Sequence, residues 1–144
     1  MIHRKNRNEP EAKAALPDPE RENQKLRSAL VEIAAEKWRF EHALKKALQK
    51  MDVMDAERFN GQFGYFSSRV AQAMAYAGMS CLDLSGQVYD VGMPVQGMNL
   101  DEFDEDEILI ITRMVEPVIL WNGRVIRTGM VLLGRAGSSR ETEE

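Results

Sequence analysis

The feature that most constrains the fold is the dipeptide Asn122-Gly123, which lies among apolar runs in the last third of the chain. Asparagine and glycine both accept a positive φ, as the two central positions of a type I′ turn require, and such a turn joins two antiparallel strands tightly. Apolar runs flank the dipeptide on both sides, at residues 108–111, 118–120, 125–126 and 130–133. The pattern therefore predicts a small all-β domain of short antiparallel strands over 78–134.

A long helix is predicted before this region. Asp18 can cap a helix whose first residue is Pro19, because aspartate favours the cap and proline favours the first helical position. Neither proline nor glycine interrupts residues 20–54, so the helix is expected to run through that whole range. A second helix is expected over 55–77, and Gly78 suits the left-handed residue that ends it.

Apolar residues in the first helix recur at alternating spacings of four and three, which is the period of a left-handed coiled coil. A small domain offers no core along which so long a stripe could lie. We therefore favour burial of the stripe by a second copy of the chain over packing against a neighbouring helix. Lys37 lies in the same stripe and is interpreted as a residue that sets the register. The predicted dimer seam consists of Leu26, Leu30, Ile33, Phe40, Leu44 and Met51.

The predicted fold class is thus α+β: a long N-terminal coiled-coil helix, a second helix and a small C-terminal β-domain. Residues 1–19 are polar and rich in proline, which predicts a disordered tail. The coiled-coil and helical region covers 20–77 and carries dimerisation, the β-domain covers 78–134, and a flexible tail covers 135–144.

Composition excludes several classes of function. The formal net charge of −4 gives no general support for binding nucleic acid. No apolar run approaches the roughly 18 residues that a membrane-spanning helix needs, so no membrane partner is expected. The single cysteine, Cys81, rules out an internal disulfide and favours a reducing compartment, so the protein is expected to be cytoplasmic.

Motifs that carry chemistry are few. The sequence contains no Cys-x-x-Cys pair, no His-Glu-x-x-His motif and no phosphate-binding glycine loop. We therefore predict no catalytic residue, no metal site and no cofactor, and we do not expect an enzyme. The alternative is a small enzyme that uses Cys81, which would need an exposed thiol with a lowered pKa.

The run 101–107 is acidic except for Phe103. It has two interpretations, a docking surface for a basic partner or a solvated loop, and from the sequence we favour the solvated loop.

Three blocks carry a resemblance to a known family: Gly78-Met79-Ser80-Cys81-Leu82-Asp83, then Gly86-Gln87-Val88-Tyr89-Asp90, then Asn122-Gly123-Arg124-Val125-Ile126-Arg127-Thr128-Gly129-Met130-Val131. They are similar in order and spacing to Gly-x-x-x-Ile-Asp, Gly-x-Pro-Phe-Asp-Pro and Leu-x-Gly-Arg-x-Leu/Ile-Arg-x-Ala-Met-Val. The C-terminal part of the chain thereby resembles the GrpE family, the nucleotide-exchange factors of bacterial 70-kDa heat-shock chaperones.

The resemblance implies a parallel homodimer of long helices, a short helical bundle and a β-domain on each chain. It also implies that the β-domain binds the nucleotide-binding domain of a 70-kDa heat-shock chaperone, or of a related actin-fold ATPase, and opens its cleft so that ADP leaves. Carried over by position, the partner-binding residues are Asn122, Gly123, Arg124, Arg127 and Met130. The two arginines are the better contact candidates, because arginine forms bidentate pairs with carboxylates.

The chain also departs from the family pattern. Val91 stands in place of a proline, Pro94-Val95-Gln96 in place of His-Glu-Ala, and Pro117-Val118-Ile119 in place of Lys-Gly-Tyr. Two hypotheses stay open. The chain is either a divergent exchange factor for a specialised ATPase, or a coiled-coil structural adaptor that keeps a GrpE-like docking head and has no exchange activity.

Overall fold

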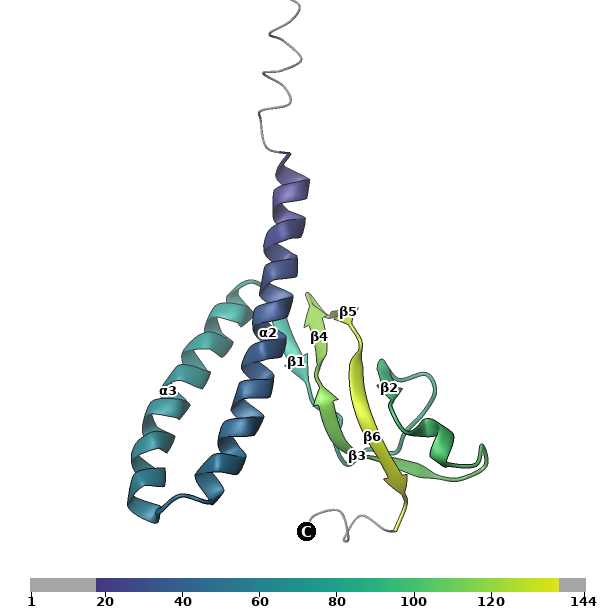
Figure 1. Cartoon of the computed structure of the whole chain (residues 1–144). Helices are drawn as coiled ribbons and strands as arrows, with labels where there is room; N and C mark the ends of the chain where they lie inside the picture. The colour runs from purple at the N-terminus through teal and green to yellow at the C-terminus, as the bar shows by residue number, and fades with distance from the viewer. Residues whose placement is uncertain (1–17, 138–144) are drawn as a thin grey trace, which may run out of the picture. The chain divides into compact units, whose positions relative to one another are not determined.

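The structure is a computed structural model that describes residues 18–137 of the 144-residue chain. Within this range two helices are followed by two three-stranded sheets, so the predicted α+β class is confirmed (Figure 1). The predicted tails over 1–19 and 135–144 lie for the most part outside the described residues.

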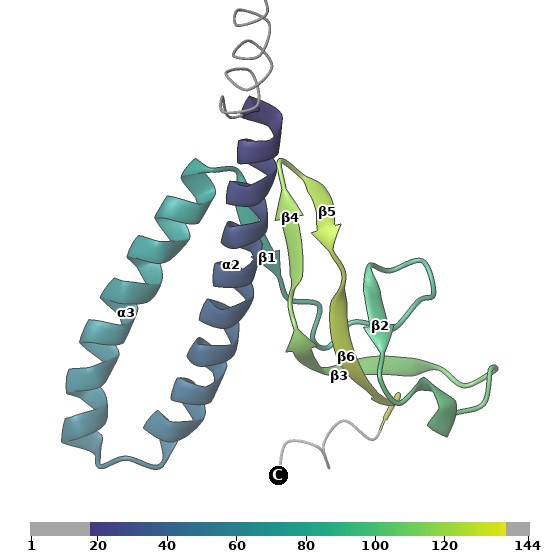
Figure 2. The same cartoon turned by 45° about the horizontal axis from the view of Figure 1, so that its top comes forward.

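The helices are α2 (Pro19–Gln49) and α3 (Val53–Tyr76), and the strands are short (Figure 2). In chain order the remaining elements are β1 (Met79–Leu82), β2 (Val95–Gly97), the 3-10 helix η1 (Leu100–Glu102), β3 (Leu109–Glu116), β4 (Val118–Trp121), β5 (Arg124–Arg127) and β6 (Gly129–Arg135).

The start of α2 follows the sequence prediction. Pro19 is its first residue, and the Asp18 side chain accepts a hydrogen bond from the backbone N–H of Glu20 at 3.1 Å. This bond satisfies one of the donors that the first turn of a helix leaves without a partner.

The end of α2 differs from the prediction. The helix stops at Gln49, before the expected end at residue 54, and the chain turns before α3 begins. Asp52 occupies the N-cap position of α3 in an extended conformation, which ends one helix and starts the next. Met51 therefore lies in the turn and not on α2, so the predicted seam ends within α2.

The two sheets have strand orders β1-β4-β5 and β2-β6-β3. Three of the strand pairs are antiparallel, as expected, but β2 runs parallel to β6, with Val95 opposite Gly129. A parallel pair needs a long connection, and here β3, β4 and β5 lie within it. The β-region is thus rich in antiparallel pairs, as predicted, with one parallel pair where β2 joins β6.

The predicted hairpin turn is confirmed. Asn122 has φ of 49° and Gly123 has φ of 81°, the positive values that a type I′ turn requires. Trp121 and Arg124 face each other across the turn, and β4 and β5 pair from there.

The main hydrophobic core lies in the β-region and includes one residue of α2. Trp38 packs into it from α2 and is only 8% exposed. The other buried members of the cluster are Leu84, Val95, Leu109, Ile111, Met114, Val118, Val131 and Leu133. Full burial of each large apolar side chain contributes about 1.5–3 kcal/mol, so this cluster fixes the second half of α2 to the strands.

The described residues group into two compact units, 18–30 and 31–137. The second unit contains Trp38, the rest of α2 from residue 31, all of α3 and every strand between residues 31 and 137. The β-region is therefore not a separate body from the helical segment that precedes it.

We expect Gly78→Ala to lower the free energy of unfolding by about 2 kcal/mol or more, because an L-residue is strained in the left-handed region. Gly78 has φ of 80°, and an added Cβ would lie 2.1 Å from the side-chain oxygen of Asn122. Gly64→Ala is the matched control, since a Cβ there meets nothing within 4 Å. The control should raise stability by about 1 kcal/mol. Urea unfolding of both variants measures the two changes in the free energy of unfolding. Equal changes would contradict the left-handed conformation assigned to Gly78.

Candidate functional site: the β4–β5 hairpin and its attachment

The sequence-predicted partner-binding residues lie along one continuous stretch of β4, β5 and β6. Asn122, Gly123 and Arg124 form the exposed tip of the β4–β5 hairpin. Arg127 is at the other end of β5, and Met130 is half-buried near the start of β6. The tip is thus the most accessible part of the predicted site.

Arg124 differs from Arg127 in its contacts. Within residues 18–137, Arg124 forms no ion pair, and its residue is exposed. A guanidinium in this state keeps its five N–H donors available for a carboxylate of another molecule.

The hairpin is fixed to the junction between α3 and β1. The indole Nε1–H of Trp121 donates to the backbone carbonyl of Ala77 at 3.1 Å, and the N–H of Asn122 donates to the carbonyl of Gly78 at 2.8 Å. These bonds continue the β1–β4 ladder into the turn that ends α3. The position of the hairpin tip therefore depends on the left-handed conformation of Gly78.

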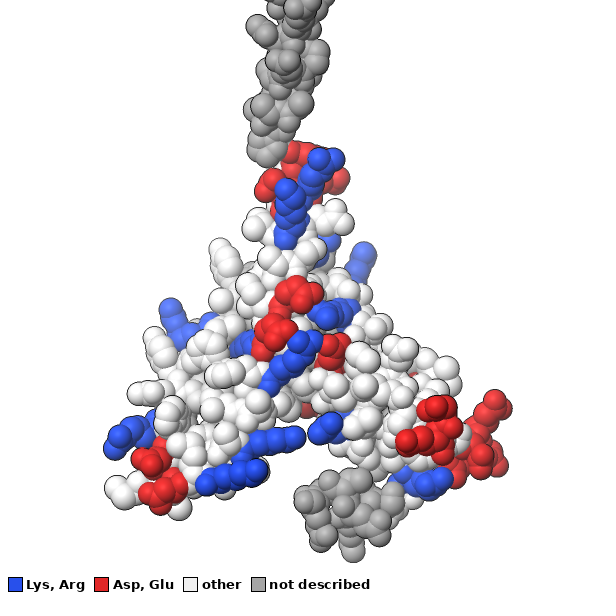
Figure 3. Space-filling view, in the orientation of Figure 1, with Lys and Arg blue, Asp and Glu red and all other residues white. Residues whose placement is uncertain are grey.

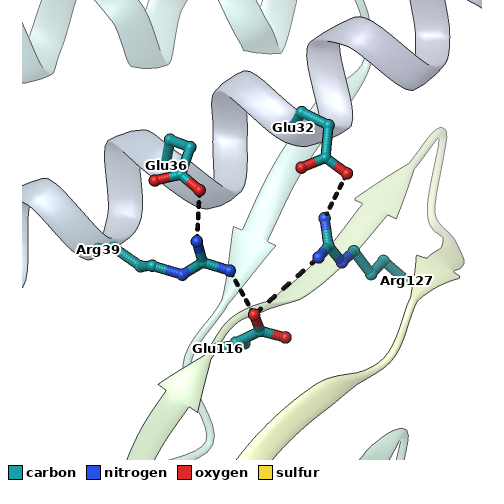
Figure 4. Close-up of polar contacts among 5 residues, drawn as sticks. All are labelled: Glu32, Glu36, Arg39, Glu116 and Arg127. Atoms are coloured by element: carbon teal, nitrogen blue, oxygen red, sulfur yellow. Dashed lines mark hydrogen bonds and ion pairs between the residues drawn. The ribbon is translucent and has the colours of Figure 1, made fainter.

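A network of ion pairs joins the same hairpin to α2 (Figure 4). Arg127 bonds Glu32 at 3.1 Å through Nη1, and its Nη2 lies 4.0 Å from Oε1 of Glu116. The same Glu116 oxygen accepts a hydrogen bond from Nη2 of Arg39, whose Nη1 donates to Glu36. One carboxylate at the end of β3 thus connects an arginine of β5 with an arginine of α2.

Glu116 is the central member of this network. Its side chain is 20% exposed, whereas that of Glu32 is 68% exposed, so water screens the Glu32 contact more strongly. The hydrogen bond to Glu116 is the main cause that raises the pKa of Arg39 above its ordinary value, so Arg39 stays charged. The network positions Arg127 within its own chain.

Sequence reasoning did not find this network. The spacing of Glu36 and Arg39 is that of neighbours on one helix face and was visible as such. Nothing in the sequence relates residue 116 to residue 39, because only the folded path of the chain brings the end of β3 to α2. Arg127 was predicted to contact a partner; its ion pairs with Glu32 and Glu116 give it an alternative role within its own chain.

The Lys37 side chain lies in a largely buried ion pair. Its ammonium is 3.0 Å from Glu41, and both side chains are about 15% exposed (14% and 15%). Lys37 thus forms an ion pair within its own chain, and its expected role in a dimer register stays a prediction.

Cys81 is exposed, as a reactive thiol would need to be, but the pKa of its thiol is raised and not lowered. Desolvation is the main cause that raises the pKa of its thiol; nearby Lys37 lowers it and Glu41 raises it further. A catalytic cysteine needs a lowered pKa, because the thiolate is the nucleophile.

His42 lies beside Trp38 on α2. The two rings stack with centroids 3.7 Å apart, and Nδ1 of His42 is 2.9 Å from the carbonyl oxygen of Trp38. Because a carbonyl can only accept, Nδ1 is the protonated nitrogen and donates. The histidine therefore supports the packing of Trp38.

Among residues 18–137 no group of three or more His, Cys, Asp or Glu side chains is arranged to hold a metal ion. No helix in the same range is long and apolar enough to cross a membrane. Comparison of the chain with family models, with curated proteins and with solved structures found no match.

We expect Glu116→Gln to weaken the attachment of the hairpin to α2, because it leaves Arg39 and Arg127 facing a neutral amide. The urea midpoint should fall, and the amides of β5 should exchange faster with deuterium. Glu32→Gln is the control and should have the smaller effect, since its carboxylate is the more exposed of the two. An unchanged midpoint and unchanged exchange in Glu116→Gln would show that the network does not hold the hairpin.

Proposed function

We propose that this chain is a GrpE-like co-chaperone that binds the nucleotide-binding domain of a 70-kDa heat-shock-type ATPase through its β-region and promotes ADP release. The observation that carries the proposal is the exposed Arg124 in a hairpin that is fixed at its turn to the end of α3 and at the far end of β5 to α2. Trp121 and Asn122 attach it to the end of α3, and Arg127 attaches it to α2.

Such an arrangement can act without a catalytic side chain. A factor that binds the open form of a cleft better than the closed form shifts the population toward the open form, and bound nucleotide then leaves faster. A fixed hairpin is suited to this task, because little binding energy is lost in ordering it.

The departures from the family pattern are both buried and exposed: Val91 is 87% exposed and Gln96 is exposed, whereas Val95 and residues 117–119 are buried. Pro117, Val118 and Ile119 are all fully buried. Val95 is buried in β2, beside β6. None of these substitutions lies at the exposed tip of the hairpin, so they leave the proposed contact of Arg124 in place, although Val91 and Gln96 change the surface elsewhere in the β-region.

The helices support a homodimer as part of the proposal. Leu26, Ile33 and Phe40 recur every seven residues along α2 and are 62%, 54% and 55% exposed. The face of α2 that its own chain buries carries other residues: Ala34, Ala35, Trp38 and Leu48. The exposed line is thus separate from the buried face and has the spacing of a coiled-coil seam.

The exposure of apolar side chains on α3 also supports a homodimer. Its 24 residues include only one buried side chain, Met74, while Phe59 and Phe66 are about half exposed (46% and 45%). Most helix stability in proteins comes from packing of an apolar face. A second copy would supply that packing.

The exchange activity is testable with a partner ATPase recovered from a cell extract by the purified protein and released from it by ATP. The protein should accelerate release of a fluorescent ADP analogue from that ATPase. Arg124→Ala should reduce the acceleration about tenfold, as expected for an arginine at the centre of an interface. Arg113→Ala is the control, because Arg113 is exposed on β3, away from the hairpin tip.

Recovery of an ATPase that binds but shows no faster ADP release would favour the structural adaptor. An equal loss in the Arg113 and Arg124 variants would remove the hairpin tip from the interface.

The dimer is testable by sedimentation equilibrium of the full chain. Ile33→Glu should convert a dimer at micromolar concentration to a monomer, because it places a charge in the middle of the exposed line. Lys46→Glu introduces the same side chain at an exposed position of α2 outside the seam and should leave the dimer intact. A dimer that survives Ile33→Glu, or a monomeric wild-type chain, would contradict the seam.

A further inference from the structure

An open groove of about 1020 Å³ lies beside η1, where residues 88–91 approach β2 and the start of β3. Its lining includes large apolar side chains that the chain leaves between 44% and 87% exposed: Val88, Val91, Met98, Leu100 and Ile108. Scattered single apolar residues are ordinary on a protein surface, but a contiguous group marks an interaction site.

Acidic side chains border the same apolar surface. Six of the seven residues in 101–107 are Asp or Glu, and Figure 3 shows acidic side chains gathered beside β2. The groove is lined by Asp90, Asp101, Asp104 and Glu105, and none of these four forms an ion pair with another residue in 18–137. No lysine or arginine is among the described residues that line it.

The acidic segment is held in a defined position. The Asn99 side chain donates to the carbonyl of Leu133 at 3.0 Å and accepts from the N–H of the same residue at 2.9 Å. At the other end Arg135 bonds Glu107 at 3.0 Å, and its guanidinium lies 5.0 Å from the ring centre of Phe103. These contacts fix both ends of the segment to β6, so the groove exists before any ligand binds.

We propose that this acidic groove is a second docking surface, which binds a partner-protein segment that carries lysine or arginine beside large apolar side chains. The charge argument is direct: carboxylates without an ion-pair partner give the groove a negative potential, which favours a ligand that carries positive charge. The apolar argument is independent, since a ligand that covers the exposed side chains removes them from water. A solvated acidic loop, which the sequence alone favoured, accounts for the charges but not for the exposed apolar side chains that line the groove.

The surface is separate from the hairpin of the proposed exchange function. The hairpin tip at Asn122 and Arg124 belongs to the β1-β4-β5 sheet, whereas the groove borders β2 and β3 of the other sheet. Binding in the groove therefore does not depend on whether the hairpin contacts an ATPase.

The test uses the full chain and a short synthetic peptide of alternating leucine and lysine. A control peptide, the glutamate twin, has glutamate in place of each lysine. Fluorescence anisotropy should detect binding of the lysine peptide and none of the glutamate twin. The triple variant Asp101→Asn, Asp104→Asn and Glu105→Gln should bind the lysine peptide about tenfold more weakly or worse. Val91→Ser with Ile108→Ser should also weaken binding, with less dependence on salt.

A matched control removes three carboxylates elsewhere: Glu20→Gln, Asp52→Asn and Glu57→Gln, all of them exposed. Its affinity should stay within about twofold of the wild type, because asparagine also serves at the helix cap that Asp52 occupies. Urea unfolding of each variant verifies that it is folded.

The proposal fails if the lysine peptide does not bind, if the glutamate twin binds equally well, or if the control loses as much affinity as the groove variant. It also fails if the groove variant changes the oligomeric state of the protein while its peptide affinity is unchanged, since a second copy would then be the occupant.

Discussion

The burial of Trp38 in the core of the sheets is the contact on which the rest of the structure depends. An indole side chain buries more surface than almost any other. In the preceding turn of α2, the small side chains of Ala34 and Ala35 are both fully buried. Small side chains at these two positions allow close packing of α2. The stacked ring of His42 holds the Trp38 ring in place. The Arg39–Glu116 pair follows one residue later on α2.

This attachment divides the surface of α2 into two parts. One face is used within the chain, by Trp38 and by the largely buried Lys37–Glu41 pair. The exposed line through Ile33 and Phe40 is left over, although its residues are as apolar as those of a core. The proposed dimer would cover these exposed side chains, including Phe40, whose ring also lies edge to face with that of Phe66 on α3.

Much of the fold could be predicted from the sequence. The hairpin turn at Asn122 and Gly123, the left-handed Gly78 and the cap at Asp18 all depend on residues close together in the chain, and all three were predicted correctly. The proposed binding residue Arg124 came from a resemblance, and its exposure at the hairpin tip agrees with a contact role. The end of α2 was missed, because neither glycine nor proline marks it and Asp52 alone was the available signal.

What the sequence determined by itself is local: the φ values of single residues, the helix start, and the period of apolar residues in each segment. These follow from steric limits and hydrogen bonds within a few residues, which any chain with that sequence shares. The tertiary structure alone decided that β2 runs parallel to β6, that Glu116 joins Arg39 to Arg127, and that an acidic segment borders exposed apolar side chains. Each of these arises between residues distant in sequence, and a local pattern cannot specify which distant segments burial of the core will bring together.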